Sequence, residues 1–409
     1  MPNSEVKKNV LLAVTGSIAA YKSVELARLF ITRGYKVRCI LTKSAQQFVT
    51  ELSLETITGH RVMTDLWAEK NTSEIEHIDF ADWADIMLIA PATADVIAKV
   101  NMGFADSALL ATALATRAPM LIAPAMNVNM YEHPKTKENI EALKQRGVFF
   151  VEPEEGDLAC GWKGAGRLAG HETIFNKARK LLTVAGMADK RVLISTGPTQ
   201  EALDPVRFLS NRSTGKMGVA LANEAYYRGA DVTLVHGPVS DHVLARLSSE
   251  IRRIPVTSAD EMKNIMLDLT YKDTFSFPHY VIMAAAVSDY RVKNIAAKKI
   301  KKDKSEGIIE LTMNEDILKL LGEKKGSNDH PYLVGFAVET GEIDELISEV
   351  NKKLKNKNVD LMVGNFAEDA FGLDTNRVWI IDKQGRRDEI ATSDKSFIAG
   401  RIIDAILRH

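Results

Sequence analysis

A glycine-rich stretch in the first half of the chain carries one of its two cysteines. It reads LACGWKGAGRL over residues 158–168, with Cys160 and Trp162 among glycines and basic residues. Such a segment is too rich in glycine for a core strand and too short for a domain linker, so it is expected to be a mobile flap that holds a thiol over a site. A surface loop with an incidental cysteine is an equal alternative on this segment alone.

Three other segments of the first half end apolar runs with small residues: GSIAAYKS (16–23), APATAD (90–95) and APAMN (123–127). Gly16 permits a tight turn, and the helix start behind it offers N–H groups to an anion. The spacing of a dinucleotide fingerprint is absent, so the single phosphate of a mononucleotide fits better than a dinucleotide. A plain strand-to-helix turn is the alternative. In open α/β sheets ligands gather at the carboxyl ends of strands, so these segments predict one crevice with room for a flat ring.

Two single residues of the first half have both a chemical and a structural interpretation. The Asn127 amide can orient a substrate carboxylate, but Asn127 could equally be a helix N-cap or turn former. His77 lies in EIEHIDFADWAD, and a lone histidine is more often structural than catalytic.

The second half has a comparable concentration of polar groups. The segment 195–218 combines glycines and hydroxyl side chains with Asn211, which suits phosphate or carboxylate binding at a helix start, although it is not a Walker A loop. AAAVSDYR (284–291) ends a strand with Asp289, which could bind a ribose hydroxyl or a metal ion on a triphosphate. The basic run KKIKKDK (298–304) could neutralise a triphosphate or be a solvated loop.

These segments are positioned by two series of alternating strands and helices. Strands are predicted at 9–16, 35–42, 84–93, 118–127 and 148–153, and a second series at 191–199, 231–237, 280–290, 332–340 and 360–365, followed by a hairpin and a terminal amphipathic helix. Continuous apolar strands between helices indicate parallel sheets covered on both faces. We therefore predict two doubly wound α/β domains, 1–187 and 188–409.

Composition narrows the functional classes. The 409 residues exceed what one core usually serves, and the net charge of -1 provides no global field for nucleic acid or an anionic membrane. No apolar run is long enough to span a bilayer and no signal peptide is apparent. Cys39 lies in an apolar run and is expected to be buried, so two cysteines make no disulfide framework and a cytoplasmic location is expected.

The first-half motifs, including His77, PAMNVNM (124–130) and ACGWKGAGRL, together resemble the flavin-dependent cysteine decarboxylases, specifically the phosphopantothenoylcysteine decarboxylase domain. The resemblance implies a flavodoxin-like fold with FMN, which oxidises the substrate's cysteinyl thiol so that the carboxylate is lost easily. It implies that His77 acts at that stage, that Asn127 and Met126 hold the substrate, and that Cys160 delivers a proton. The implied FMN-binding residues are Gly16, Ser17, Thr42, Ala90, Pro91, Ala92 and Thr93.

The motifs DPVRFLSNRSTGKMG, AAAVSDYR, KIKK and GFAVET resemble the phosphopantothenate–cysteine ligase domain. With both halves matched, the chain resembles the bacterial bifunctional decarboxylase–ligases of coenzyme A synthesis. The resemblance implies that CTP with Mg²⁺ activates 4′-phosphopantothenate as an acyl-cytidylate, which L-cysteine then attacks to give 4′-phosphopantothenoylcysteine. Asn211 would hold the acyl carbonyl beside a Rossmann-like sheet, and Lys299 would serve the second step or loop closure. The other implied ligand-binding residues are Ala285, Ala286, Asp289 (possibly through Mg²⁺), Glu315, Asp316, Ile317, Leu318, Phe336, Lys353 and Lys357.

Three residues depart from the usual family pattern: Asp95, Tyr131 and Glu315, which stand where Asn, Trp and Pro are common. Other classes remain open for each half, namely a flavin-binding regulatory or prenyltransferase-like relative and a nucleotide-binding module without ligase activity. The resemblance also implies trimeric decarboxylase units and dimeric ligase units, which together could close into a homododecamer.

Overall fold

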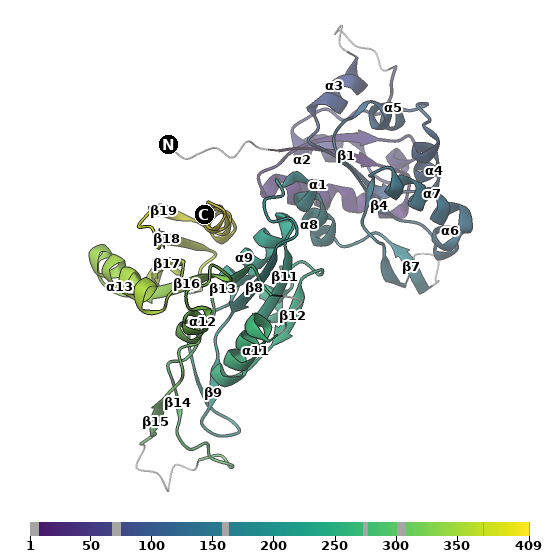
Figure 1. The fold of residues 1–409 in the computed structure, drawn as a ribbon. Coiled ribbons are helices and arrows are strands. Elements are labelled where there is room, and N and C mark those ends of the chain that lie inside the picture. Colours follow the sequence, from purple (N-terminus) through teal and green to yellow (C-terminus); the bar gives the residue numbers. More distant parts are fainter. Residues whose placement is uncertain are drawn as a thin grey trace. The chain divides into compact units, whose positions relative to one another are not determined.

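The chain folds into two units, Met1–Val184 and Ala185–His409, each with its own hydrophobic core (Figure 1). The computed structural model describes residues 8–67, 75–157, 163–272, 277–300, 308–370 and 372–408. Across these ranges no helix has both the length and the apolar character needed to cross a bilayer.

The first unit is built on a parallel five-stranded sheet with the order β2-β1-β3-β4-β5, which is a flavodoxin-like arrangement. In this order β1 lies between β2 and β3, so the strand order reverses between β1 and β3. Sheets of this kind bind ligands at the carboxyl ends of the strands beside that reversal. The strands are β1 (Asn9–Val14), β2 (Lys36–Leu41), β3 (Ile86–Ala92), β4 (Met120–Pro124) and β5 (Phe149–Phe150).

Helices cover both faces of this sheet. Along β1, Val10, Leu12 and Val14 enter one core and Leu11 and Ala13 the other, so both faces are buried and the strand is continuously apolar. The first core is covered by α1 (Lys22–Thr32), α2 (Glu51–Thr58) and α8 (His171–Leu182). The second is covered by α3 (Glu76–Trp83), α4 (Ala94–Met102), α5 (Ala108–Ala115) and α7 (Pro134–Gln145). Cys39 is buried, as expected.

The second part of the glycine-rich stretch is a strand. Residues Lys163–Arg167 form β7, which pairs antiparallel with β6 (Glu154–Asp157). Gly164 and Gly166 thus belong to a two-stranded hairpin outside the main sheet, in agreement with the expectation that this stretch is not a core strand. Cys160 and Trp162 lie outside the described residues.

The second unit contains an eight-stranded sheet with the order β12-β11-β8-β13-β16-β17-β18-β19. The strands from β12 to β17 are parallel, and the predicted hairpin adds β18 and β19 antiparallel at one edge. The short edge strand β12 was not predicted. The strands are β8 (Arg191–Thr196), β11 (Asp231–His236), β12 (Arg252–Pro255), β13 (Tyr280–Met283), β16 (Tyr332–Glu339), β17 (Leu361–Phe366), β18 (Thr375–Asp382) and β19 (Arg387–Asp394).

Helices again cover both faces. One core receives side chains from α9 (Lys216–Tyr227), α10 (Asp241–Leu244) and α15 (Lys395–Ile406). The opposite core receives them from α11 (Ala259–Tyr271), α12 (Ile317–Lys325) and α13 (Ile343–Asn356). We refer to these as the α9/α15 face and the α11–α13 face.

Two small hairpins extend away from this sheet, and we call them the hairpin arm (Figure 1). They pair β9 (Gln200–Ala202) with β10 (Phe208–Ser210), and β14 (Tyr290–Val292) with β15 (Leu311–Met313). Asp204 joins the two hairpins, because its carboxylate accepts hydrogen bonds from the Arg207 side chain and from the backbone N–H of Ile300, 3.2 Å away. These bonds hold the pKa of Asp204 well below its usual range. The sequence did not predict this arm.

A buried ion pair fixes the amino end of β16. The Lys325 ammonium contacts the Asp360 carboxylate, and both side chains are almost fully buried. Asp360 also accepts hydrogen bonds from the Leu333 N–H and from Lys383, each at 2.7 Å. Removing one partner of a buried pair leaves the other charge poorly compensated.

We expect Lys325→Met to lower the free energy of unfolding of the second unit by about 2–4 kcal/mol, less than for an isolated pair because Lys383 remains. Lys319→Met is the matched control, since Lys319 is an exposed lysine on the same helix, and its loss should cost about 0.5 kcal/mol or less. Urea denaturation measures both changes. Equal effects of the two substitutions would show that the buried pair contributes no more than a surface charge.

Candidate active sites

In the first unit, hydrogen bonds tie together the carboxyl ends of β1 and β3. The Thr15 hydroxyl donates to the Pro91 carbonyl oxygen at 2.8 Å and accepts from the Thr93 N–H at 3.0 Å. Thr93 in turn caps α4, where its hydroxyl accepts from the Val96 N–H. The predicted cofactor segment at residues 90–93 is therefore held against the turn that contains Gly16.

The turn after β1 approaches the turn after β2 very closely. A Cβ atom added to Gly16 would lie 2.2 Å from the Cβ of Ser44, so only glycine fits there. Thr42 begins the second turn, and its hydroxyl accepts from the Ala45 N–H at 3.2 Å. Ser17 caps the short helix Ile18–Tyr21, which leads into α1. All seven predicted FMN-binding residues thus lie at one edge of the sheet, beside N–H groups that can face an anion.

Asn127 follows β4 at the same edge and caps the short helix α6 (Val128–Glu132). Its Oδ1 accepts from the Asn129 N–H at 2.8 Å, so Asn127 does act as an N-cap, and its role toward a substrate stays a prediction. The β7 hairpin packs directly on this turn: the Met126 N–H donates to the Gly166 carbonyl oxygen at 3.0 Å. A Cβ on Gly166 would lie 2.3 Å from the Met126 carbonyl oxygen. The hairpin that leads into and out of residues 158–162 is therefore anchored beside Asn127.

His77 lies in the first turn of α3, which packs against α5. It is half-buried, and its imidazole makes no hydrogen bond or ion pair to any described residue. Among those residues, no hydrogen bond or ion pair joins His77 to Gly16, Thr93 or Asn127.

Two of the family departures have visible structural roles. The Tyr131 hydroxyl donates to a Glu152 oxygen at 2.6 Å, and the Lys137 ammonium lies 4.0 Å from the centre of the tyrosine ring. Burial and the neighbouring Glu152 carboxylate raise the pKa of Tyr131. Asp95 is exposed and pairs with Lys99 one turn along α4 at 3.5 Å.

The second unit contains a cavity of about 660 Å³ at the carboxyl ends of β8, β13, β16 and β17. Its volume lies within the range of small-molecule sites. It is lined by every ligase residue predicted from the sequence except Lys299, namely Asn211, Ala285, Ala286, Asp289, Glu315, Asp316, Ile317, Leu318, Phe336, Lys353 and Lys357.

The Asn211 amide organises one wall of this cavity. Its Nδ2 donates to the carbonyl oxygens of Ala286 and Val287 at 3.0 and 3.2 Å. Below it, the Thr199 hydroxyl accepts from the Ser288 N–H at 3.0 Å. In this structure the amide donors of Asn211 therefore hold the small-residue segment after β13.

The charged residues that line the cavity from the α11–α13 face are ion-paired. Lys353 contacts Glu339 at 2.5 Å and Lys357 contacts Asp316 at 2.7 Å, so the two lysines lie on one side of α13 as their spacing predicted. Asp316 is the N-cap of α12, and Glu315 precedes it and pairs with Lys263 at 2.8 Å. Glu315 thus lies before the helix, which begins at Ile317.

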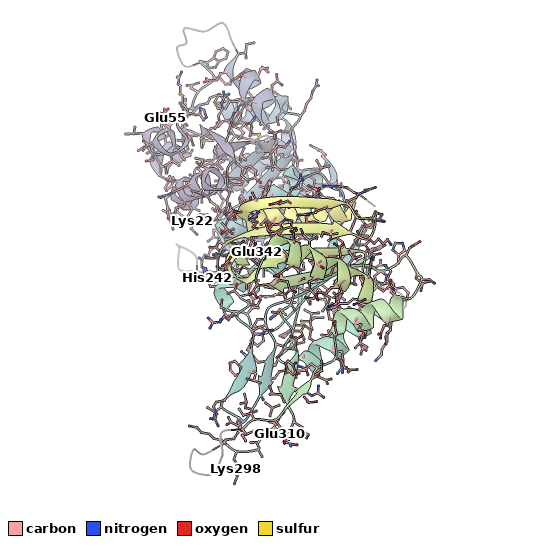
Figure 2. The ribbon with its side chains drawn as sticks, turned by 90° about the vertical axis from the view of Figure 1, so that its left-hand side faces the viewer. Lys22, Glu55, His242, Lys298, Glu310 and Glu342 are labelled. Atoms are coloured by element: carbon pink, nitrogen blue, oxygen red, sulfur yellow. The ribbon has the colours of Figure 1, made fainter. Side chains whose placement is uncertain are left out.

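Lys299 lies on the hairpin arm and does not line the cavity of its own chain. Its neighbour Ile300 is bonded to Asp204 and Arg207 in the other hairpin. Figure 2 shows Lys298 and Glu310 together at the end of the arm, away from the sheet.

Asp289 does line the cavity, although no cluster of three metal-ligating side chains occurs among the described residues. A Mg²⁺ ion held mainly by substrate phosphates needs only one or two carboxylates.

Comparison with known proteins follows the division into two units. Residues 1–183 match the family model described as Flavoprotein, and residues 187–409 match the DNA/pantothenate metabolism flavoprotein C-terminal domain. The coenzyme A biosynthesis bifunctional protein CoaBC of Bacillus subtilis is 44% identical over 405 residues, covering 98% of this chain and 96% of its own. The chain belongs to the family of bifunctional coenzyme A biosynthesis proteins.

Two further relatives bear on this family assignment. The coenzyme A biosynthesis bifunctional protein CoaBC of Haemophilus influenzae is 38% identical, covering 98% of this chain and 97% of its own. A cysteine/cysteine sulfinic acid decarboxylase from an unknown prokaryotic organism is 41% identical, covering 88% of this chain and 99% of its own. The sequence-based resemblance to the bifunctional family is therefore confirmed.

Sequence reasoning missed the other end of the ligase cavity. Asn365, Asn376 and Lys395 line it, together with Lys216, which was noted only as part of a polar loop. Lys395 begins a helix that reads as an ordinary terminal amphipathic helix. The one feature of the sequence that could have indicated Lys395 as a cavity residue was its place at the start of an apolar helical pattern. This signal is weak because lysine is common on helix surfaces.

We expect Asn211→Asp to loosen the segment after β13, because a carboxylate cannot donate to the two carbonyl oxygens. Hydrogen–deuterium exchange of residues 284–290 should then be faster than in the wild type. Ser213→Ala is the control, since this nearby residue lines the same cavity without bonding to that segment. Unchanged exchange in Asn211→Asp would show that the amide does not order this wall.

Proposed function

We propose that the chain catalyses two consecutive steps of coenzyme A biosynthesis. The second unit joins L-cysteine to 4′-phosphopantothenate using CTP, and the first unit decarboxylates the resulting 4′-phosphopantothenoylcysteine to 4′-phosphopantetheine. The observation that carries this proposal is that eleven residues, which the resemblance to the ligase family implies, line one cavity in a member of the bifunctional family. We place the boundary between the two activities at residues 187 and 188.

For the first unit we infer that the flavin is FMN. A single phosphate suits the crowded turn of Gly16, which has no room for a Cβ, and the start of the helix behind Ser17. The Thr15–Pro91–Thr93 hydrogen bonds hold the small residues 90–93 beside that turn, leaving space for the ring. When bound, FMN supplies oxidation of the substrate's cysteinyl thiol and the later return of hydride.

The protein's own residues position the substrate and move protons. Asn127 orients the substrate carboxylate with Met126 beside it, while its Oδ1 stabilises the turn that carries it. Carbon dioxide leaves the oxidised substrate because the electron pair is delocalised into the adjacent C=S bond, which gives an enethiolate. Cys160 then protonates that species. Because His77 makes no hydrogen bond or ion pair to these strand ends, we propose that it serves the site of a neighbouring copy in a trimer.

For the second unit, we propose that Lys353, Lys357, Phe336 and residues 315–318 bind CTP, with Asp289 holding Mg²⁺ on the triphosphate. The lysines already face carboxylates, so nucleotide phosphates would replace Glu339 and Asp316 as their partners. Ala285 and Ala286 have no bulky side chains, which lets the acyl group approach the backbone. Asn211 borders the acyl group through the segment that it holds.

Lys299 requires a second copy of the chain. The hairpin arm exposes large apolar side chains that one chain leaves uncovered, which is characteristic of an interface. They are Val206, Phe208, Ile295, Ile308 and Leu311. We propose that two arms pack together in a ligase dimer, so that Lys299 of one chain serves the cavity of the other. Dimeric ligase units and trimeric decarboxylase units would then close into a homododecamer.

The two-step proposal predicts strict dependence on substrates. Purified protein should release pyrophosphate from CTP only with phosphopantothenate, and cysteine should then give carbon dioxide and 4′-phosphopantetheine. Cys160→Ser should still make the amide and lose carbon dioxide, but stall at the unsaturated enethiol with the flavin reduced, because no proton is delivered. Mass spectrometry and flavin absorbance report both. Normal turnover by this variant would remove Cys160 as the proton donor, and release of carbon dioxide from free cysteine alone would favour a simple cysteine decarboxylase.

The dimer proposal predicts complementation between variants. Lys299→Gln should accumulate acyl-cytidylate, because the second step or the closing of the loop is lost. Co-expression with an Asp289→Asn chain should restore ligation, since a mixed dimer contains one cavity with its own Asp289 and the partner's Lys299. If Lys299 served its own chain, both cavities of the mixed dimer would be defective and no activity would return.

A further inference from the structure

A hydrogen bond that the proposed function does not use connects the turn of Asn127 to the strand that leads into the β7 hairpin. Tyr131 lies in α6, and its backbone N–H donates to the Asn127 carbonyl oxygen at 3.0 Å. Its hydroxyl donates to a Glu152 oxygen at 2.6 Å. Glu152 lies between β5 and β6, the first strand of the hairpin. A single side chain therefore joins the Asn127 turn to the entry of the hairpin.

The tyrosine ring has little freedom to move. It is 5% exposed and belongs to the core cluster against which Met126 and Ala165 also pack. Met126 directly precedes Asn127, and Ala165 lies in β7. The Lys137 ammonium lies 4.0 Å from the centre of the ring. Because a ring packed in this way fixes the place of its hydroxyl, the bond to Glu152 constrains both segments that it joins.

The Glu152 carboxylate is held in the ionised form that accepts this bond. Its other oxygen contacts the Lys144 ammonium at 3.0 Å. Burial acts to raise the pKa of Glu152, but the hydrogen bonds from Tyr131 and Lys144 and the charges of Lys144 and Lys137 outweigh it and lower that pKa. A hydroxyl that donates to a carboxylate at 2.6 Å makes a charge-assisted bond, which is stronger than one between neutral groups.

The second strand of the hairpin supports the same turn from another side. The Met126 N–H donates to the Gly166 carbonyl oxygen at 3.0 Å, and a Cβ on Gly164 would lie 2.7 Å from the Val128 Cγ2. The turn is thus held by β7 directly and by the entry to β6 through Tyr131. Loss of the tyrosine hydroxyl removes one of these two supports and leaves the other in place.

We propose that Tyr131 is a positioning residue for decarboxylation, which holds the Asn127 amide in the orientation that binds the substrate carboxylate by tying its turn to Glu152. This inference rests on the proposed decarboxylase function of the first unit. Tyr131 acts through the backbone of α6 and through Glu152, and not on the reacting atoms.

The test compares Tyr131→Phe with the wild-type full-length holoenzyme, since phenylalanine keeps the ring and removes the donor. We expect kcat/KM for decarboxylation of 4′-phosphopantothenoylcysteine to fall about 3- to 10-fold, the net contribution of one hydrogen bond. The inhibition constant of 4′-phosphopantetheine should stay the same, because this product has no carboxylate for Asn127 to hold. A general loss of packing would weaken both ligands alike.

A second measurement does not depend on catalysis. Hydrogen–deuterium exchange of residues 128–132 should be faster in Tyr131→Phe than in the wild type, and exchange in α4 should be unchanged. Equal FMN content and equal ligase activity of the two proteins would show that both units of the variant are folded.

Two substitutions at carboxylates show whether Glu152 is the partner through which Tyr131 acts. Glu152→Ala should reproduce the loss, and the double variant Tyr131→Phe/Glu152→Ala should be no worse than either single variant, because both remove the same bond. Glu138→Ala is the matched control. Glu138 is an exposed carboxylate on α7 that pairs with Lys135 at 2.6 Å, and its loss should leave decarboxylation unchanged.

The outcomes separate the positioning role from the proposed function. If the wild type does not convert 4′-phosphopantothenoylcysteine to 4′-phosphopantetheine, the proposed function fails, whatever the exchange experiment shows. If the wild type is active and Tyr131→Phe keeps its kcat/KM, only the positioning role is overturned. Equal weakening of substrate and 4′-phosphopantetheine would also overturn it, and so would additive losses in the double variant, because Tyr131 would then not act through Glu152 on the group that binds the carboxylate.

Discussion

Hydroxyl side chains at the end of the first strand of each unit hold the neighbouring strand in place, and both sites depend on these tethers. In the first unit Thr15, just after β1, bonds to the backbone of Pro91 and Thr93 after β3. In the second unit Ser195, at the end of β8, accepts from the Ala285 N–H, and Thr199 accepts from the Ser288 N–H. Backbone that leaves a sheet edge has lost its ladder partners, so these side chains satisfy it and fix its course. Ligands are then bound by segments that are already ordered.

The same arrangement explains why much of the fold could be predicted from the sequence. Strands buried on both faces are continuously apolar, and β1, β3, β8 and β16 were recognised for that reason. Parallel topology brings their carboxyl ends together, whereas the residues from Asn211 to Lys357 were assigned to one site through the resemblance to the ligase family. The hairpin arm was missed because its strands are three residues long and half-exposed, and such strands have neither length nor a clear alternation.

The site residues that sequence could not place are those whose position depends on tertiary or quaternary contacts. Lys299 has suitable chemistry but does not line the cavity of its own chain, and His77 makes no hydrogen bond or ion pair to the strand ends of its own chain. Lys395 and Asn376 are the reverse case, since only the packing of α15 against β18 makes them line the cavity. The pairing of the β7 glycines was not predicted because glycine is a poor strand former, and these glycines approach residues 126–128 closely.

That close approach has a consequence for how the hairpin can vary. Gly164 and Gly166 face Val128 and the Met126 carbonyl oxygen, and a methyl group on either would lie within 2.7 Å of them. The base of the hairpin is therefore fixed to the turn of Asn127 by the absence of side chains. Insertions or deletions between the two strands need not disturb that base, whereas a single alanine within it would push the turn itself. The length of the hairpin tip and the residue types at its base are thus under separate constraints. The segment around Cys160 can therefore change for other substrates while the Asn127 amide stays in position.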